Sequence, residues 1–314
     1  MQVGAGIMHH ARRWMPKGAP VSDHGLLIAG GAAGIAAAFN TPLGGVMFAI
    51  EELAKNPEQR SSGLILAAIV IGGMMSVSVY GNASYFGVIR VENFGSALIL
   101  PGLLVVVCSG VAGGLFSRLL AVSLAGRSLD WFSKFRRKFP VKFAAACGLA
   151  VAVLGVVSQG ATYGSGYAHT RSILEANSES SSLYVLFKFI ATWLTTWSGV
   201  PAGIFAPSLA IGGALGNDIA QLTSYANAPT LVALGMAGFL AAVTQAPLTS
   251  FIIVMEMVDG HALVLSLMAS AMVASRISRL IGAPLYSTLA SLQLLRLPLR
   301  SAQKKGAPKG SNLI

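Results

Sequence analysis

Residues 198–207, with the sequence SGVPAGIFAP, place two glycines and two prolines inside an otherwise apolar stretch, and this interruption constrains the fold more than any other feature. A uniform membrane helix would not carry them at mid-span, because proline removes a backbone donor and obstructs the helix. Backbone N–H groups left unpaired at membrane depth must face protein, water or a ligand. A helix that begins at such a break directs its positive end towards an anion. The stretch therefore predicts an anion site built from a helix start.

The composition independently indicates a membrane protein. The chain is 54% hydrophobic and 11% charged, whereas soluble domains have a charged fraction of roughly 25%. Many of the apolar segments are near the roughly 20 residues that cross a bilayer, although several are longer or are broken by glycine and proline. The segments lie near 25–50, 62–80, 97–125, 141–159, 182–197, 203–222, 229–257 and 262–281. We therefore predict an all-helical, polytopic membrane protein.

The net charge of +11 does not require a nucleic-acid partner, because most basic residues fall on one set of loops. They flank the first long apolar run, fill the loop near 127–142 and crowd the C-terminal end. Loops rich in Lys and Arg face the cytoplasm. We predict a transmembrane domain over 1–295 and a short, basic, disordered cytoplasmic tail over 296–314, close to anionic lipid.

Enzyme functions are not expected. The sequence has no nucleotide-binding loop, metal-ligand helix motif or nucleophile elbow. We therefore predict no catalytic residues, no metal site and no cofactor.

An internal repeat is visible in the residues. Aligning Pro42 with Pro247 pairs Asn40 with Gln245 and Glu51 with Glu256. The charge pattern has the chain enter 25–53 from the cytoplasm and 230–258 from the opposite side. This predicts inverted repeats, an architecture in which transporters place their site at the repeat interface.

Three segments resemble the CLC family of chloride channels and transporters, in the family's order. They are GIFAP at 203–207, AAGIAAAFNTPLGGVMFAIEE at 32–52 and GAPLYS at 282–287. The resemblance covers about residues 1–295. It implies a CLC-like fold with broken and re-entrant helices, working as a homodimer with a pore in each subunit. It also implies a multi-pass protein of the bacterial inner membrane that transports chloride and protons.

The resemblance also implies chloride-binding residues. At a helix start, the backbone N–H groups of Ile204 and Phe205 would hold the ion while their side chains shape the pocket. The alternative for this segment is a proline-kinked packing helix. Tyr286 would direct its hydroxyl at the central anion; the alternative is an aromatic residue of the membrane interface. The implied set is Gly203, Ile204, Phe205, Ala206, Pro207 and Tyr286.

The acidic pair at the end of the first apolar run has two interpretations. One is a solvated helix end with salt bridges. The repeat, however, separates the two residues, because Glu51 matches Glu256 whereas Glu52 matches Met257. Glu51 and Glu256 are therefore predicted to be structural carboxylates that accept backbone hydrogen bonds. Glu52 resembles the internal proton acceptor of the family's exchangers, a position that is usually apolar in its pure channels.

Lys188 is the one charged residue between Leu183 and Trp197, and such residues are costly at membrane depth. It would either add positive potential around the anion path or serve as a structural partner for a carboxylate or carbonyls. Both roles are left open by the sequence.

The repeat projects the partner of 203–207 to a position upstream of Met1. The GREGP-type and GSGIP-type segments of the family are not found in the 314 residues. We therefore expect a chain that lacks roughly the first third of the fold. The favoured function is chloride/proton antiport in the complete parent protein. The alternatives are a passive channel of the voltage-gated type and a non-transporting truncated homologue.

Overall fold

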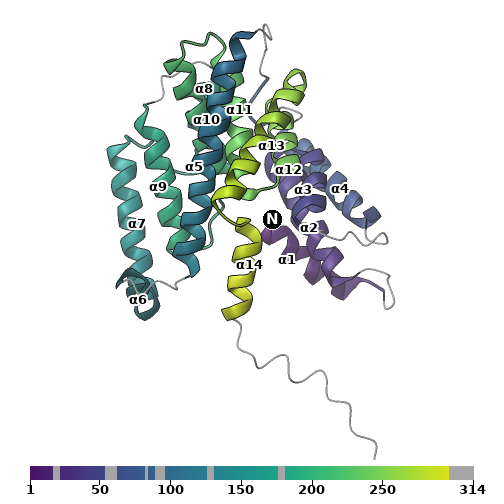
Figure 1. Ribbon diagram of the computed structural model, residues 1–314. Helices are drawn as coiled ribbons and strands as arrows, with labels where there is room; N and C mark the ends of the chain where they lie inside the picture. The colour runs from purple at the N-terminus through teal and green to yellow at the C-terminus, as the bar shows by residue number, and fades with distance from the viewer. Residues whose placement is uncertain are drawn as a thin grey trace, which may run out of the picture.

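The computed structural model describes residues 1–16, 22–53, 62–81, 84–88, 96–125, 131–175 and 181–296. Among these described residues the structure is helical and contains no strand (Figure 1). The α-helices are α1 (Gln2–Ala11), α2 (Asp23–Phe39), α3 (Pro42–Phe48), α4 (Ser62–Tyr80), α5 (Ile99–Ala125), α6 (Trp131–Lys138), α7 (Pro140–Val157), α8 (Tyr167–Leu174), α9 (Leu183–Trp197), α10 (Phe205–Leu222), α11 (Ala228–Thr244), α12 (Pro247–Met257), α13 (Val264–Ile281) and α14 (Leu285–Arg296).

Three helical segments are long and apolar enough to cross a membrane: Ile99–Ala125, Pro140–Val157 and His261–Ile281. Other apolar helices are shorter. Large apolar side chains are exposed on α4, α5 and α7, as expected for surfaces that face lipid. The prediction of an all-helical polytopic membrane protein is confirmed.

Two of the long apolar stretches are helix pairs, and local chemistry explains each break. α2 ends at Asn40 and α11 ends at Gln245, and both residues adopt the left-handed conformation, with φ of 53° and 59°. Such a residue terminates a helix. Pro42 and Pro247 then open the next helix, where their fixed φ is favourable and a missing N–H is harmless.

The predicted repeat relates α1–α4 to α10–α13, and its two halves pack in the same way. The backbones of α1 and α2 touch at Gly4 and Gly30, while those of α10 and α11 touch at Gly212 and Gly235. In each of the four positions an added Cβ would overlap the carbonyl oxygen of the facing glycine. Small residues at these crossings are what allow the helices to approach so closely.

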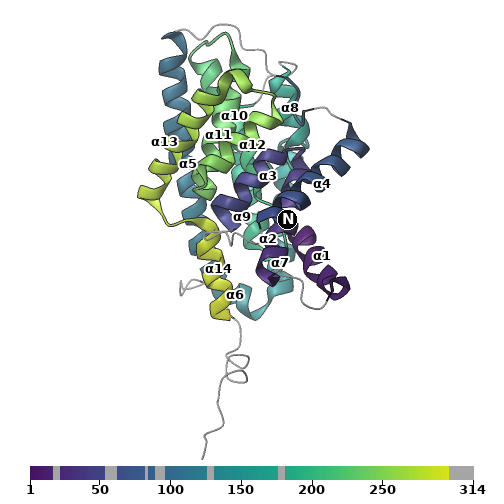
Figure 2. The ribbon, with the colours of Figure 1, turned by 90° about the vertical axis from the view of Figure 1, so that its right-hand side faces the viewer.

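The repeats are inverted. In Figures 1 and 2, α3 and α12 lie side by side at the centre of the molecule. Glu51, which follows α3, bonds to the start of α12, and Glu256, near the end of α12, bonds to the start of α3. Each helix therefore ends where the other begins, so the two run antiparallel, as the charge pattern predicts.

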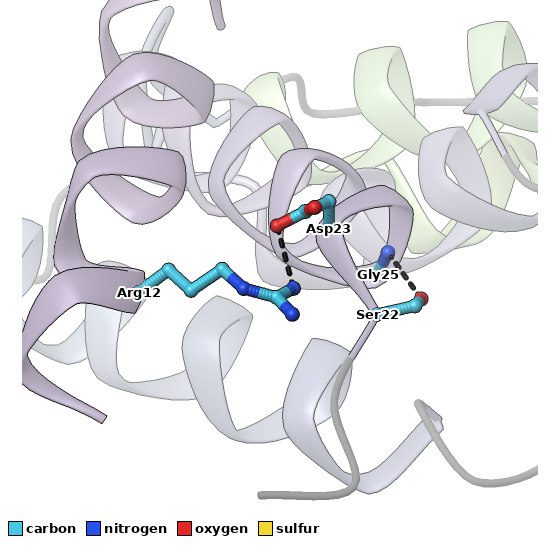
Figure 3. A network of polar contacts seen from close by, with 4 residues as sticks. All are labelled: Arg12, Ser22, Asp23 and Gly25. Carbon is cyan, nitrogen blue, oxygen red and sulfur yellow. Dashed lines mark hydrogen bonds and ion pairs between the residues drawn. The ribbon is translucent and has the colours of Figure 1, made fainter. Parts of the chain in front are cut away.

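The first two helices are joined by local polar contacts (Figure 3). Arg12, after α1, forms an ion pair with Asp23 in the first turn of α2. Ser22 caps α2, because its hydroxyl accepts a 3.0 Å hydrogen bond from the N–H of Gly25. The ion pair therefore links the end of α1 to the first turn of α2, and the Ser22 cap stabilises the start of α2.

One end of the bundle is basic. Figures 1 and 2 place α1, α6 and α14 at the same end, with α8 at the opposite end. The basic residues Arg12 and Arg13 follow α1, and α6 contains the sequence KFRRK. This grouping agrees with the predicted cytoplasmic side. The predicted tail, residues 296–314, lies outside the described residues apart from Arg296, so the domain boundary stays a prediction.

Candidate functional site

The start of α10 leaves backbone donors without partners. Ile204 is the N-cap, and the first intrahelical bond runs from the N–H of Ser208 to the carbonyl of Ile204 at 3.0 Å. Pro207, the third helical residue, has no N–H to lose. The N–H groups of Ile204, Phe205 and Ala206 have no hydrogen-bond acceptor among the described residues. Together with the helix dipole they present a positive end suited to an anion.

A cavity of about 500 Å³ adjoins this helix start, and we call it the α10 cavity. Gly203, Phe205, Ala206 and Pro207 line one wall, and the space beside Gly203 is open. Threonines 192, 195 and 196 of α9 line another wall. The side chain of Ile204 does not line the cavity, because it is buried in an apolar cluster with Phe116 and Leu285. The structure therefore places Phe205 at the cavity wall and turns the Ile204 side chain into the core, and the part that both residues play in chloride binding stays a prediction.

Tyr286 lies beside Phe205, with the two ring centroids 6.2 Å apart, although the residues are 81 positions apart in the sequence. Phe205 also contacts Phe39 at the end of α2 and Phe48 at the end of α3, at 6.3 and 5.7 Å. Tyr286 is the second residue of α14 and is half-buried. The fold thus brings the GIFAP segment, the GAPLYS segment and the end of the first repeat into one aromatic cluster. Phe39 and Phe48 were not singled out from the sequence, although both lie in the 32–52 segment.

Glu52 lies in a π-helical turn, Ala49–Leu53 (η2), that follows α3. It is half-buried and close enough to Tyr286 for its charge to act on the tyrosine hydroxyl. In the second repeat, α12 continues as an α-helix as far as Met257. The repeat symmetry therefore breaks at the position of Glu52, and π-helical turns are frequent at functional sites.

Glu51 and Glu256 each bond to the start of a helix in the opposite repeat. The Glu51 carboxylate accepts hydrogen bonds from the N–H groups of Leu248 and Thr249, at 3.2 and 2.7 Å. The Glu256 carboxylate accepts them from Leu43 and Gly44, at 3.0 and 2.7 Å. Each carboxylate therefore neutralises the positive end of a helix in the opposite half. We call these four bonds the carboxylate clamp.

Lys188 is 2% exposed, and its ammonium group donates to two backbone carbonyls. The acceptors are Thr162, at 2.9 Å, and Gly164, at 2.8 Å, in the turn that precedes α8. Of the two roles left open by the sequence, these bonds favour the structural partner for carbonyls. Lys188 also lines the α10 cavity, so its charge lies near the helix start.

The comparisons with known proteins fit this geometry. The family described as "Voltage gated chloride channel" matches residues 1–279. The chain belongs to this family. Among curated relatives, the "H(+)/Cl(-) exchange transporter ClcA" of Citrobacter koseri is 33% identical over 299 residues, covering 90% of this chain and 61% of the relative. The protein of the same name from Salmonella agona is 33% identical, covering 92% of this chain and 63% of the relative.

Solved structures of two antiporters share the fold. A CLC-type fluoride/proton antiporter superposes with a TM-score of 0.75 at 23% identity, covering 91% of this chain and 70% of the other. A slow cyanobacterial Cl⁻/H⁺ antiporter gives 0.76 at 23% identity, covering 94% and 70%. The chain spans 61–63% of the length of the curated relatives named above.

Proposed function

We propose that this chain binds chloride at the start of α10 and takes part in chloride transport, most specifically as a chloride/proton antiporter. The observation that carries the proposal is the set of unpartnered N–H groups at 204–206. They lie at a helix start where Phe205 and Ala206 line the α10 cavity, and the Phe205 ring lies next to that of Tyr286. Membership of the voltage gated chloride channel family and the names of the curated relatives support it.

Chloride is held in this proposal by dipoles rather than by a full charge. The helix start supplies N–H donors, and the Tyr286 hydroxyl supplies a neutral donor. The Lys188 ammonium contributes positive potential, while two carbonyls accept two of its three protons and hold it in the turn before α8. A site of this kind binds an anion while still allowing it to leave, which transport requires.

Chloride binding can be tested with Tyr286→Phe in the purified 314-residue chain. We expect calorimetric titration to show binding weakened by about 1 kcal/mol, roughly fivefold, for one lost hydrogen bond. Tyr225→Phe is the matched control, because Tyr225 follows the opposite end of α10. Equal chloride affinity in Tyr286→Phe and the parent would leave Tyr286 as an interfacial aromatic only.

Glu52 carries the proton in the proposed exchange. A partly desolvated carboxylate near the cytoplasmic face can take up and release protons, and Glu52 lies within electrostatic reach of Tyr286 at the chloride site. Glu51 cannot take this role while its oxygens accept the N–H groups of α12. We further propose a homodimer in the bacterial inner membrane, with a chloride site in each subunit.

Proton coupling can be tested in liposomes with Glu52→Gln. The assay compares the 314-residue chain with a chimera in which the upstream part of the Citrobacter koseri relative precedes Met1. We expect Glu52→Gln to lose uphill proton movement while chloride flux persists, whereas Tyr225→Phe should keep both. Unchanged proton movement in Glu52→Gln would contradict the role of Glu52. Chloride flux without any proton coupling in the parent would favour the passive channel, and no flux from either form would favour a non-transporting homologue.

A further inference from the structure

A second cavity, of about 460 Å³, lies at the basic end of the molecule and shares no lining residue with the α10 cavity. We call it the α6 cavity. It lies between α6 and the turn that follows α9. Its polar lining consists of Ser133, Arg136, Arg137, Ser198 and Gly199. None of these residues takes part in the proposed transport.

The lining has the chemistry that recognises a phosphate group. Arg136 and Arg137 both line the cavity, and a guanidinium group offers planar, paired donors that match phosphate oxygens. Arg136 is held towards the cavity by a 3.4 Å hydrogen bond from its Nη1 to the carbonyl of Ser123. Gly199 has a φ of +87°, and a Cβ there would lie 3.5 Å from Nη2 of Arg136. The guanidinium group thus rests directly against the turn at 198–199.

The helix that carries these arginines has the character of a membrane-interface helix. Trp131 is 67% exposed and stacks on Phe135 with a centroid separation of 5.4 Å. The ammonium groups of Lys138 and Lys142 lie over the Phe139 ring, at 5.4 and 5.0 Å. Aromatic rings combined with snorkelling lysines are typical of helices that lie at the headgroup level.

The start of α7 continues the same surface towards the bilayer interior. Pro140, its first residue, lines the α6 cavity. Beyond it, Val141, Leu149, Val153 and Val156 are all exposed on a helix that is long and apolar enough to span a membrane. A phosphate in the cavity would therefore have an apolar stripe beside it along which an acyl chain can run. A free anion would make no use of that stripe.

We propose that the α6 cavity binds the phosphate headgroup of an anionic phospholipid, whose acyl chains pack on α7. The headgroup holds α6 against the turn at 198–199. That turn begins the segment leading to Gly203 and the start of α10, so the lipid also restrains the approach to the candidate chloride site. The lipid site rests on the α6 cavity and α7 alone and does not require the proposed transport.

The test is a titration of the purified full chain with phosphatidylglycerol in neutral detergent, followed by native mass spectrometry. Parallel titrations use phosphatidylcholine with the same acyl chains and inorganic phosphate. The variant is Arg137→Gln, because Arg137 is exposed and its loss should not disturb folding. The matched control is Lys134→Gln, which removes one charge from the same helix without touching the cavity lining.

We expect one saturable phosphatidylglycerol site whose affinity falls about tenfold in Arg137→Gln and stays unchanged in Lys134→Gln, as for one charge-assisted bond. Phosphatidylcholine should not saturate the site, and inorganic phosphate should not displace the lipid at equal concentration. Equal affinity in the two variants would overturn the assignment to this cavity. Displacement by inorganic phosphate would show that the cavity takes a free anion and would overturn the lipid proposal. If the lipid proposal fails in either of these ways while Tyr286→Phe still weakens chloride binding, the proposed function stands.

Discussion

The carboxylate clamp predicts that Glu256→Gln loosens the contact between the two inverted repeats. The Glu256 carboxylate accepts two backbone N–H groups at the start of α3, at 3.0 and 2.7 Å. A glutamine side chain has one acceptor oxygen, and its NH₂ group would face the second N–H as donor against donor. The substitution therefore removes one charge-assisted bond and leaves the positive N-terminal start of α3 without its counter-charge.

The magnitude follows from those two losses. A hydrogen bond to a charged group contributes about 1.5–3 kcal/mol, and a charge at a helix terminus contributes about 0.3–1 kcal/mol. The bond to Leu43 is exposed, so solvent reduces its share. We expect a destabilisation of about 2 kcal/mol, with the bond to Gly44 supplying most of it.

Thermal unfolding of the purified chain in detergent measures this effect. We expect Glu256→Gln and Glu51→Gln each to lower the midpoint by several degrees. Because both carboxylates act on the same antiparallel pair of α3 and α12, the double variant should lose less than the sum. Glu175→Gln is the control, since its exposed ion pair with Arg171 contributes little. A midpoint for Glu256→Gln equal to that of Glu175→Gln would refute a structural role for the clamp.

Two further predictions concern packing and pH. Gly212→Ala should destabilise the chain by about 1–3 kcal/mol or more, because the new methyl group overlaps the carbonyl of Gly235. Gly148→Ala is the control and should not destabilise the chain, because the space around Gly148 is open. Similar unfolding midpoints for the two variants would contradict the close contact of α10 and α11. His169, in the short helix α8, has its pKa lowered by partial burial and then by the charge of Lys188. The unfolded chain then binds the proton more readily, so stability should fall as the pH drops through about 6.5 and below, and His169→Gln should remove part of that dependence. An unchanged pH profile of unfolding in His169→Gln would show that another group is responsible.

The sequence by itself determined the local features of the fold. The glycines and prolines at 198–207 dictate a helix start near Phe205, since proline is compatible only with a first turn. Asn40 and Gln245, each followed by a proline two residues later, dictate the broken helix pairs. The repeat is detectable in the sequence because equivalent residues, such as Asn40 and Gln245, adopt the same local backbone conformation. In all of these cases the determining contacts lie within a few positions along the chain.

Tertiary structure alone decided which distant groups meet. The sequence paired Glu51 with Glu256, but only packing of α3 against α12 sets each carboxylate on the other helix's start. The sequence left two roles open for Lys188, and only the fold brings the carbonyls of Thr162 and Gly164 to its ammonium group. The side chain of Ile204 lies in the core, in one apolar cluster with Phe116 of α5 and Leu285 of α14. A hydrogen bond or an apolar contact between remote segments depends on the arrangement of whole helices, and no local pattern of residues encodes which partner that arrangement delivers.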